Sequence, residues 1–390
     1  MPEAHGYLQA LLRNIGVLRE RAGLTPAQLE ERLILGPGWI ERFESGESVP
    51  SIDMMLAILH ETGAGLQDLL HALPEPEPAQ VERIIFAEQV GNAIRIHFRY
   101  AKFDAQYTLP NARLEEFEAV IKTLRDGLSR LAVVNEGQSE AIKSDSVARA
   151  FLTAVRAWPH ANPSDLWWFL VYRAYCDPYN HPAQYARLDF TQSWKRTGGW
   201  ALEEVLVRYY GPFLKQNGVN LYVADGAEKQ ILVDALRLED RVEADKIDVV
   251  LTGGTPRGQK FFGVVHVKAS FAERRTDDVP LSIALVGGGF TSPLWTMDCK
   301  SAPGENPVNR GELGDVERRR SAKRKDIEDE GYFTGCFSYN RNTQPTPPGL
   351  PEERRVHVCD FSNPDDAFSR FIIRRWQAFP KDRARAGNSV

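Results

Sequence analysis

The stretch that decides the fold is Asp245–Arg274, DKIDVVLTGGTPRGQKFFGVVHVKASFAER. It holds two short apolar runs rich in β-branched residues, Ile247–Leu251 and Phe261–Val267, separated by the turn-forming segment TGGTPRG. This pattern predicts two adjacent strands of a hairpin. Asp248 lies in the first strand and Lys268 ends the second. Because a carboxylate or an ammonium group is costly to bury without compensation, we interpret this pair as functional.

A carboxylate and a lysine at the end of a buried sheet suit phosphodiester hydrolysis. Asp248 would hold a divalent cation against the scissile phosphate, and Lys268 would stabilise charge on the attacking water and the phosphorane. The arrangement resembles the core of the PD-(D/E)XK nucleases, with Ile247 in place of the proline and His266 in place of the acidic residue. This resemblance implies an α/β restriction-endonuclease-like domain with Mg2+ as its cofactor.

The segment after the lysine, KASFAERRTDD, is similar to the BsaWI-type branch of the restriction endonucleases that cut CCGG sites. In that branch an acidic residue and an arginine follow the catalytic lysine, and Glu273 and Arg274 match them. Glutamate accepts from cytosine N4 and arginine donates to guanine N7 and O6, so the pair implies readout of a C·G step. The longer motif places another arginine where this chain has Phe271, and Arg275 is the candidate substitute.

A third carboxylate is expected from the helix before the hairpin, which is predicted from about Trp200 to Gln216. PD-(D/E)XK nucleases commonly have such a helix, and the resemblance implies that it presents a glutamate to the metal. Glu203 is assigned this role because it lies one helical turn before Leu206 on the apolar face. Glu204 is the alternative.

Further polar residues lie within or after the hairpin. Asp277 and Asp278 open a predicted helix, and each is interpreted either as an N-cap or as an additional member of the site. Asp298 and Lys300 end another predicted strand and rank second to the first pair, because no partner carboxylate precedes them and no Glu-Arg pair follows. His266 is interpreted as a strand residue beside the site, with metal ligation as the alternative.

A second basic segment lies in a helix predicted over Asp315–Glu330, which carries Arg318–Arg320 and Lys323–Lys325. Such a run forms either a solvated face or a face that grips phosphates. The sequence leaves both interpretations open.

Apolar residues at helical spacing run through residues 8–70. The predicted helices are Leu8–Arg21, Pro26–Leu33, Pro37–Ser45, Ile52–Thr62 and Leu66–Leu70. Thr25 and Pro26 suit the N-cap and first position of the second helix, and Gly46 follows the third. This succession of five helices with their cap residues resembles the helix-turn-helix domains of the XRE type. The resemblance implies that residues 1–72 form an all-α N-terminal domain that binds DNA.

The third predicted helix departs from that family where bases are usually read. The positions that normally hold polar side chains are Gly36, Pro37, Gly38 and Trp39. Arg42 is therefore the remaining candidate for a helix-turn-helix DNA contact. Residues 1–72 also contain five arginines, no lysine and ten acidic residues, a balance that opposes binding to phosphates. DNA binding and a docking or dimerisation role both stay open.

The rest of the chain divides by composition into a multi-domain architecture. Residues 72–82, ALPEPEPAQVE, are typical of a linker. Strand-like runs and then a helix over Asn111–Leu131 predict that residues 73–134 form a small α+β module, a linker or dimerisation element. The polar segment 135–146 marks the next boundary, and residues 147–390 are expected to form the α/β PD-(D/E)XK endonuclease domain.

Composition limits the number of domains, the cellular location and the partners that we expect for this chain. Its 390 residues are 43% hydrophobic, enough for two or three folded domains. No run approaches the roughly 18 apolar residues of a membrane helix, and no secretory signal is seen, so we expect a cytoplasmic protein without a membrane partner. The four cysteines form no C-x-x-C pair and are expected to be reduced thiols. A net charge of −5 means that DNA binding requires a local basic groove.

These observations favour a Mg2+-dependent type II restriction endonuclease that cuts double-stranded DNA within a palindromic site centred on CCGG. The catalytic set is Asp248, Lys268 and Glu203, the metal ligands are Asp248 and Glu203, and the base-reading residues are Glu273, Arg274 and Arg275. A palindromic target implies a homodimer or a tetramer. Two alternatives remain: a transcriptional regulator with a non-catalytic sensing or oligomerisation domain, and a less specific defence or repair nuclease.

Overall fold

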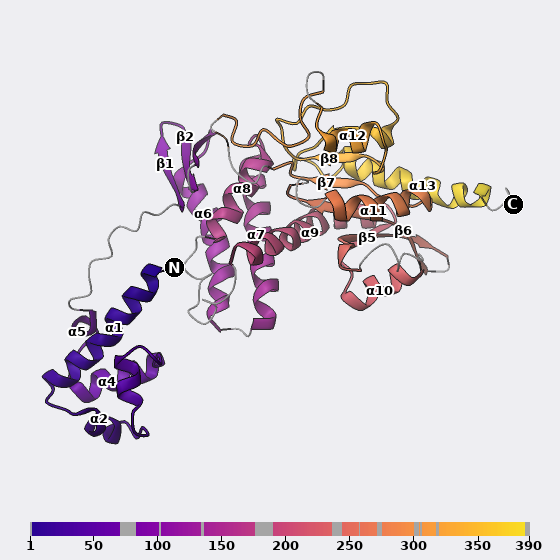
Figure 1. The fold of residues 1–390 in the computed structure, drawn as a ribbon. Helices are drawn as coiled ribbons and strands as arrows, with labels where there is room; N and C mark the ends of the chain where they lie inside the picture. Colours follow the sequence, from indigo (N-terminus) through magenta and orange to yellow (C-terminus); the bar gives the residue numbers. More distant parts are fainter. Residues whose placement is uncertain are drawn as a thin grey trace. The chain divides into compact units, whose positions relative to one another are not determined.

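The computed structural model describes residues 2–70, 83–100, 103–133, 136–175, 190–235, 244–256, 258–270, 275–299, 304, 306–316 and 320–386. The chain forms two compact units, Met1–Val81 and Glu82–Val390, called here the N-terminal and C-terminal units. Figure 1 shows the elements of each unit along the chain. Among the described residues, no helix is both long and apolar enough to cross a membrane.

The N-terminal unit is all-α, as predicted. Its helices are α1 (Pro2–Arg21), α2 (Pro26–Arg32), α3 (Trp39–Glu44), α4 (Ile52–Thr62) and α5 (Leu66–Leu70). Thr25 caps α2 in a capping box with Gln28. The helix α3 begins at Trp39, two residues later than predicted, because Gly38 has a left-handed backbone with φ 84° that cannot continue a helix. Apolar residues from the helices, including Leu12, Ile40 and Ile58, form the core of this unit.

The C-terminal unit is built on a six-stranded mixed sheet. Its strands are β4 (Val219–Tyr222), β5 (Val249–Thr255), β6 (Gly258–Lys268), β7 (Leu294–Thr296), β8 (Cys336–Ser338) and β9 (Val356–Val358), in the order β4-β5-β6-β7-β8-β9. Pairs β4–β5 and β5–β6 are antiparallel, whereas β6 to β9 run parallel. The predicted hairpin is therefore confirmed, and it joins the antiparallel part of the sheet to the parallel part.

The hairpin strands are longer than the sequence predicts. Most of the segment predicted as a turn is extended, and Gly253 pairs with Lys260 across the hairpin. Helix α13 (Ala367–Ala386) packs closely here, because a Cβ atom on Gly253 would lie 2.2 Å from the indole of Trp376. Glycine makes room for this tryptophan, and the turn is confined to the residues between Thr255 and Gly258.

The C-terminal unit also contains helices, which are labelled in Figure 1. They are α6 (Leu114–Leu128), α7 (Glu136–Ala157), α8 (Pro163–Tyr175), α9 (Phe190–Gln216), α10 (Gly226–Ala235), α11 (Arg275–Gly287), α12 (Ala322–Glu328) and α13 (Ala367–Ala386), with short 3-10 turns at Ser129–Val133, Ala244–Lys246 and Glu352–Arg354. Val249 and Val265 pack in the core that includes α9 and α13. Val250 and Val264, on the opposite face, pack with α10 and α11. Both faces of the hairpin are thus buried.

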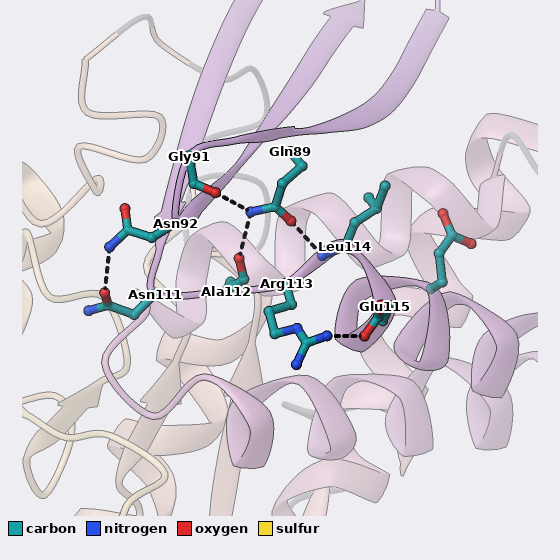
Figure 2. Close-up of a pocket in the computed structure, with 9 residues that line it drawn as sticks. Gln89, Gly91, Asn92, Asn111, Ala112, Arg113, Leu114 and Glu115 are labelled. Atoms are coloured by element: carbon teal, nitrogen blue, oxygen red, sulfur yellow. Dashed lines mark hydrogen bonds and ion pairs between the residues drawn. The ribbon is translucent and has the colours of Figure 1, made fainter.

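The first strands of the C-terminal unit form a separate antiparallel sheet. Its strands are β1 (Arg83–Val90), β2 (Ala93–Tyr100) and β3 (Phe103–Pro110), in the order β1-β2-β3. Gln89 ties this sheet to the start of α6: its Nε2 donates to Gly91 O at 2.9 Å, and its Oε1 accepts from Leu114 N at 2.8 Å. Figure 2 shows these bonds around a surface pocket. None of the candidate catalytic residues lines that pocket.

The structure differs from expectation at the segment 135–146, where a boundary is predicted. From Glu136 onward the segment is the first half of α7. Its small polar residues allow close packing against α6, since a Cβ on Gly127 would lie 2.2 Å from Ser146 Oγ. Buried residues of the small sheet, such as Ile94, share one hydrophobic core with the larger sheet, and residues 82–390 form one compact unit.

Candidate active site

The hairpin brings Asp248 and Lys268 into contact. Asp248 precedes β5 and Lys268 ends β6, so the antiparallel register sets them at the same end of the hairpin. Lys268 Nζ donates to Asp248 Oδ2 at 2.7 Å, and Val267 N donates to the same oxygen at 2.8 Å. Each residue is only 6% exposed. Two full charges buried this deeply need each other, or a ligand, to be tolerated.

Asp278 adds a second carboxylate to this pair. It lies on α11, is 1% exposed, and its Oδ1 is 3.3 Å from Lys268 Nζ. Since α11 begins at Arg275, Asp278 lies within the helix and is not its N-cap. Burial raises the pKa of Asp278, but the neighbouring His266 and the charge of Lys268 outweigh burial and hold the pKa below its usual value. Asp278 is therefore a carboxylate at neutral pH. The side chain of Asp277 lies outside the described residues.

Glu203 supplies a third carboxyl group from α9. It is 7% exposed, and burial together with the charge of Asp248 raises its pKa to about 8, against the opposing charges of Lys229 and Lys268. Glu204 is directed elsewhere, because its Oε2 accepts from Arg208 Nε at 2.9 Å. Of the two glutamates considered from the sequence, Glu203 is the one that interacts with the hairpin carboxylate.

A cation fits this cluster of side chains. Asp248, His266 and Asp278 each offer one ligand atom, and these atoms all lie within 4.8 Å of one another. Asp278 Oδ2 is buried and has no hydrogen-bond partner among the described residues. A buried carboxylate oxygen without a partner is costly unless a ligand satisfies it. Carboxylate oxygens are the ligands that hard divalent cations prefer.

Asp298 of the second Asp-x-Lys pattern belongs to the scaffold. Asp298 is buried and accepts from Glu312 N at 2.6 Å, Thr343 Oγ1 at 2.6 Å and Leu313 N at 3.2 Å. Its carboxylate is thereby used to hold two loops together. Lys300 lies outside the described residues.

The proposed base-reading residues cannot be placed. Glu273 and Arg274 lie outside the described residues, and only the backbone of Arg275 is described, as the first residue of α11. In the N-terminal unit, Arg42 Nε lies 3.3 Å from Glu47 Oε1, and its guanidinium stacks 4.9 Å from the ring centroid of Trp39. Arg42 is thus partly neutralised by its own domain.

Three basic residues of the segment around α12, Arg320, Lys323 and Arg324, form ion pairs within the fold. Arg324 is fully buried and bonds Glu328 Oε1 at 2.8 Å. Arg320 pairs with Glu328 and Asp329, and Lys323 Nζ donates to Glu312 Oε2 at 2.5 Å. The helix covers only Ala322–Glu328, and residues 317–319 are not described.

The sequence contains a signal that places Asp278 in the site, beyond the two alternatives of an N-cap and a site member. Asp278 lies three residues before Leu281 and seven before Leu285, both buried on the inner face of α11. This is the same helical spacing that selects Glu203. No sequence periodicity predicts the contact of Ser292 with His266. Ser292 lies in the loop before β7, and the parallel pairing of β7 with β6 brings it next to His266.

Comparisons with known proteins agree with this geometry. Type II restriction enzyme AgeI of Thalassovita gelatinovora is 39% identical over 237 residues, which are 59% of this chain and 83% of that enzyme. The crystal structure of the specific AgeI–DNA complex matches with a TM-score of 0.59 and 32% identity, over 75% of this chain and 99% of the other. This chain belongs to the AgeI family of type II restriction enzymes.

As an AgeI-family enzyme, the protein is a site-specific deoxyribonuclease. A pre-specific BsaWI–DNA complex is more distant, with a TM-score of 0.36 and 15% identity over 69% of this chain and 95% of the other. Residues 10–73 match the family described as "Helix-turn-helix domain". The restriction-endonuclease family and the N-terminal helix-turn-helix domain predicted from the sequence are both confirmed.

Proposed function

We propose that this AgeI-family enzyme hydrolyses DNA phosphodiesters with Mg2+ within a palindromic site centred on CCGG. The observation that carries the proposal is the buried contact of Lys268 with Asp248 and Asp278 at the end of the hairpin. No packing requirement accounts for a lysine and two carboxylates in one desolvated cluster, whereas phosphoryl chemistry needs this combination.

Asp248, Asp278 and Glu203 would hold the cation. When bound there, Mg2+ would supply positive charge to the scissile phosphate and would lower the pKa of a coordinated water. Glu203, whose pKa is raised to about 8 chiefly by burial, would give up its proton on joining the ligand set. Lys268, oriented by the two aspartates, stabilises the negative charge that builds up on the phosphorane oxygens.

Glu273 and Arg274 would read the C·G steps. They follow Lys268 closely in sequence and directly precede α11, whose Asp278 is part of the candidate site. A short connection of this kind couples base readout to the positioning of the phosphate. Arg275 is the further candidate for a base contact. A palindromic site requires two copies related by a twofold axis, so we propose a homodimer, or a tetramer built from such dimers.

We propose that the helix-turn-helix unit assists assembly or adds a secondary DNA contact. Its net charge of −5 and the pairing of Arg42 with Glu47 leave few groups free to neutralise phosphates. Tethering to an anchored catalytic domain raises the local concentration of DNA and makes a weak contact effective.

Digestion of a sequenced plasmid with the full-length enzyme and Mg2+, followed by mapping of the ends, tests the proposed function. We expect all ends to lie within sites that contain CCGG. Scattered ends would favour a less specific nuclease, and an intact plasmid would favour a non-catalytic regulator.

A further inference from the structure

His266 takes the position that is acidic in the PD-(D/E)XK pattern. It lies on β6 two residues before Lys268, so both side chains extend from the same face of the strand, toward α11. The imidazole is completely buried, and the ring of Phe333 packs against it edge-on at 5.3 Å. A histidine buried in this way must have both ring nitrogens satisfied by defined partners.

One ring nitrogen is satisfied by a chain of hydroxyl groups. His266 Nε2 lies 2.9 Å from Ser292 Oγ, which lies 2.8 Å from Ser282 Oγ. Ser282 donates its proton to the carbonyl oxygen of Tyr332 at 2.7 Å. A carbonyl only accepts, so the proton between the two serines belongs to Ser292. His266 Nε2 must therefore be the donor to Ser292.

The other ring nitrogen is left facing the carboxylates. In the tautomer that carries its proton on Nε2 alone, the lone pair of the ring is on Nδ1. Nδ1 is buried, has no hydrogen-bond partner among the described residues, and lies 3.9 Å from Asp278 Oδ1. A cation between Nδ1 and the carboxylate would make a favourable contact with each of them.

We propose that His266 Nδ1 is a ligand of the cation held by Asp248 and Asp278, so that this enzyme binds Mn2+ in clear preference to Mg2+. The inference rests on the metal site of the proposed function and specifies its ligand set. A nitrogen ligand suits a transition ion far better than Mg2+, which takes oxygen. The bond from Nε2 to Ser292 is the kind of outer contact that fixes the tautomer of a metal-binding histidine.

The test measures metal binding to the full-length protein without DNA. Calorimetric titration with Mn2+ and with Mg2+ gives the ratio of the two dissociation constants, and pulsed electron paramagnetic resonance on bound Mn2+ detects coupling to an imidazole nitrogen. The variant His266→Gln keeps an amide donor for Ser292 and removes Nδ1. We expect it to lose the nitrogen coupling and to bind Mn2+ about tenfold or more weakly, with Mg2+ binding changed by less than about threefold.

His357→Gln is the matched control. His357 lies on β9, stacked on Phe337, and its Nε2 also has no hydrogen-bond partner among the described residues. We expect this variant to keep the wild-type ratio and the nitrogen coupling. Circular dichroism shows whether each variant is folded, and His266→Asn serves as a second variant if the glutamine is not tolerated.

The outcomes separate this inference from the function on which it rests. Wild-type protein that binds Mn2+ without nitrogen coupling, or a ratio unchanged in His266→Gln, would overturn the role of His266 and leave the carboxylate site standing. A wild-type protein that binds neither ion, with or without a CCGG duplex, would overturn the metal site itself. An equal loss of both ions in His266→Gln would show that His266 only positions Asp278.

Discussion

Replacing Lys268 by methionine tests whether the lysine is the charge that allows the carboxylates to be buried together. Its Nζ lies 2.7 Å from Asp248 and 3.3 Å from Asp278, and all three side chains are almost fully buried. Methionine retains most of the aliphatic chain and removes only the ammonium charge. The two aspartates then face each other without a counter-ion.

The expected loss follows from these distances. At about 3 Å and an effective dielectric constant of about 20, each attraction amounts to roughly 5 kcal/mol before the desolvation of the ammonium is subtracted. Breaking a buried pair typically costs about 3–5 kcal/mol. Protonation of one aspartate limits the loss, because at about pH 7.5 it costs roughly 5 kcal/mol for a carboxyl with an ordinary pKa. We therefore expect Lys268→Met to lower the free energy of unfolding by about 3–5 kcal/mol without divalent ions.

The assay is denaturant unfolding of the full chain, followed by tryptophan fluorescence, with and without Mg2+. At about ten times its dissociation constant a ligand stabilises the folded state by about 1.4 kcal/mol. We expect the variant to gain more than the wild type at the same Mg2+ concentration, since the ion no longer competes with an ammonium. Lys323→Met, which removes the partner of Glu312, is the control and should show no additional response to Mg2+. A Lys268→Met variant with the wild-type free energy of unfolding, or one whose free energy of unfolding does not change with Mg2+, would refute the reasoning.

Three further predictions concern the rest of the chain. Glu273→Ala and Arg274→Ala should each lose about 1–3 kcal/mol of discrimination per contact, measured as competition between a CCGG duplex and a scrambled one; an unchanged ratio for both would disprove base readout. Arg324→Met should lower the free energy of unfolding by about 3–5 kcal/mol because Glu328 is left buried, and a loss below about 1 kcal/mol in denaturant unfolding would contradict this. The isolated N-terminal domain, residues 1–72, should bind random DNA only weakly at physiological salt, and tight, sequence-specific binding in a gel-shift titration would instead support a controller role.

The catalytic hairpin could be predicted from sequence because its signals are local. Two short apolar runs rich in β-branched residues, a turn segment rich in glycine, and the charged residues Asp248 and Lys268 are all visible in the chain. The antiparallel register then brings Asp248 and Lys268 together without further information. The preference for Glu203 over Glu204 was likewise possible, because helical spacing distinguishes an inner face from an outer one.

What could not be predicted depends on contacts between distant segments. The need for glycine at position 253 follows from the indole of Trp376, more than a hundred residues later in the chain. The burial of Arg324 depends on carbonyl groups of Leu313 and Gln344, which no periodicity reveals. The polar composition of residues 135–146 predicts a domain boundary. The close packing of α6 against this segment, at Gly127, depends on tertiary contacts that composition does not show. In each case tertiary packing overrides the local pattern.

The central claim is that the cluster around Asp248 and Lys268 performs the hydrolysis. The most direct measurement compares cleavage and binding of a CCGG duplex by wild type and by Asp248→Ala. With Mg2+, we expect the cleavage rate of the variant to fall by about a thousandfold or more, equivalent to about 4 kcal/mol in the barrier. Without metal, its affinity for the same duplex should be retained or slightly raised, because one negative charge near the phosphate is gone. A variant that still cuts the duplex at the wild-type rate would contradict the account.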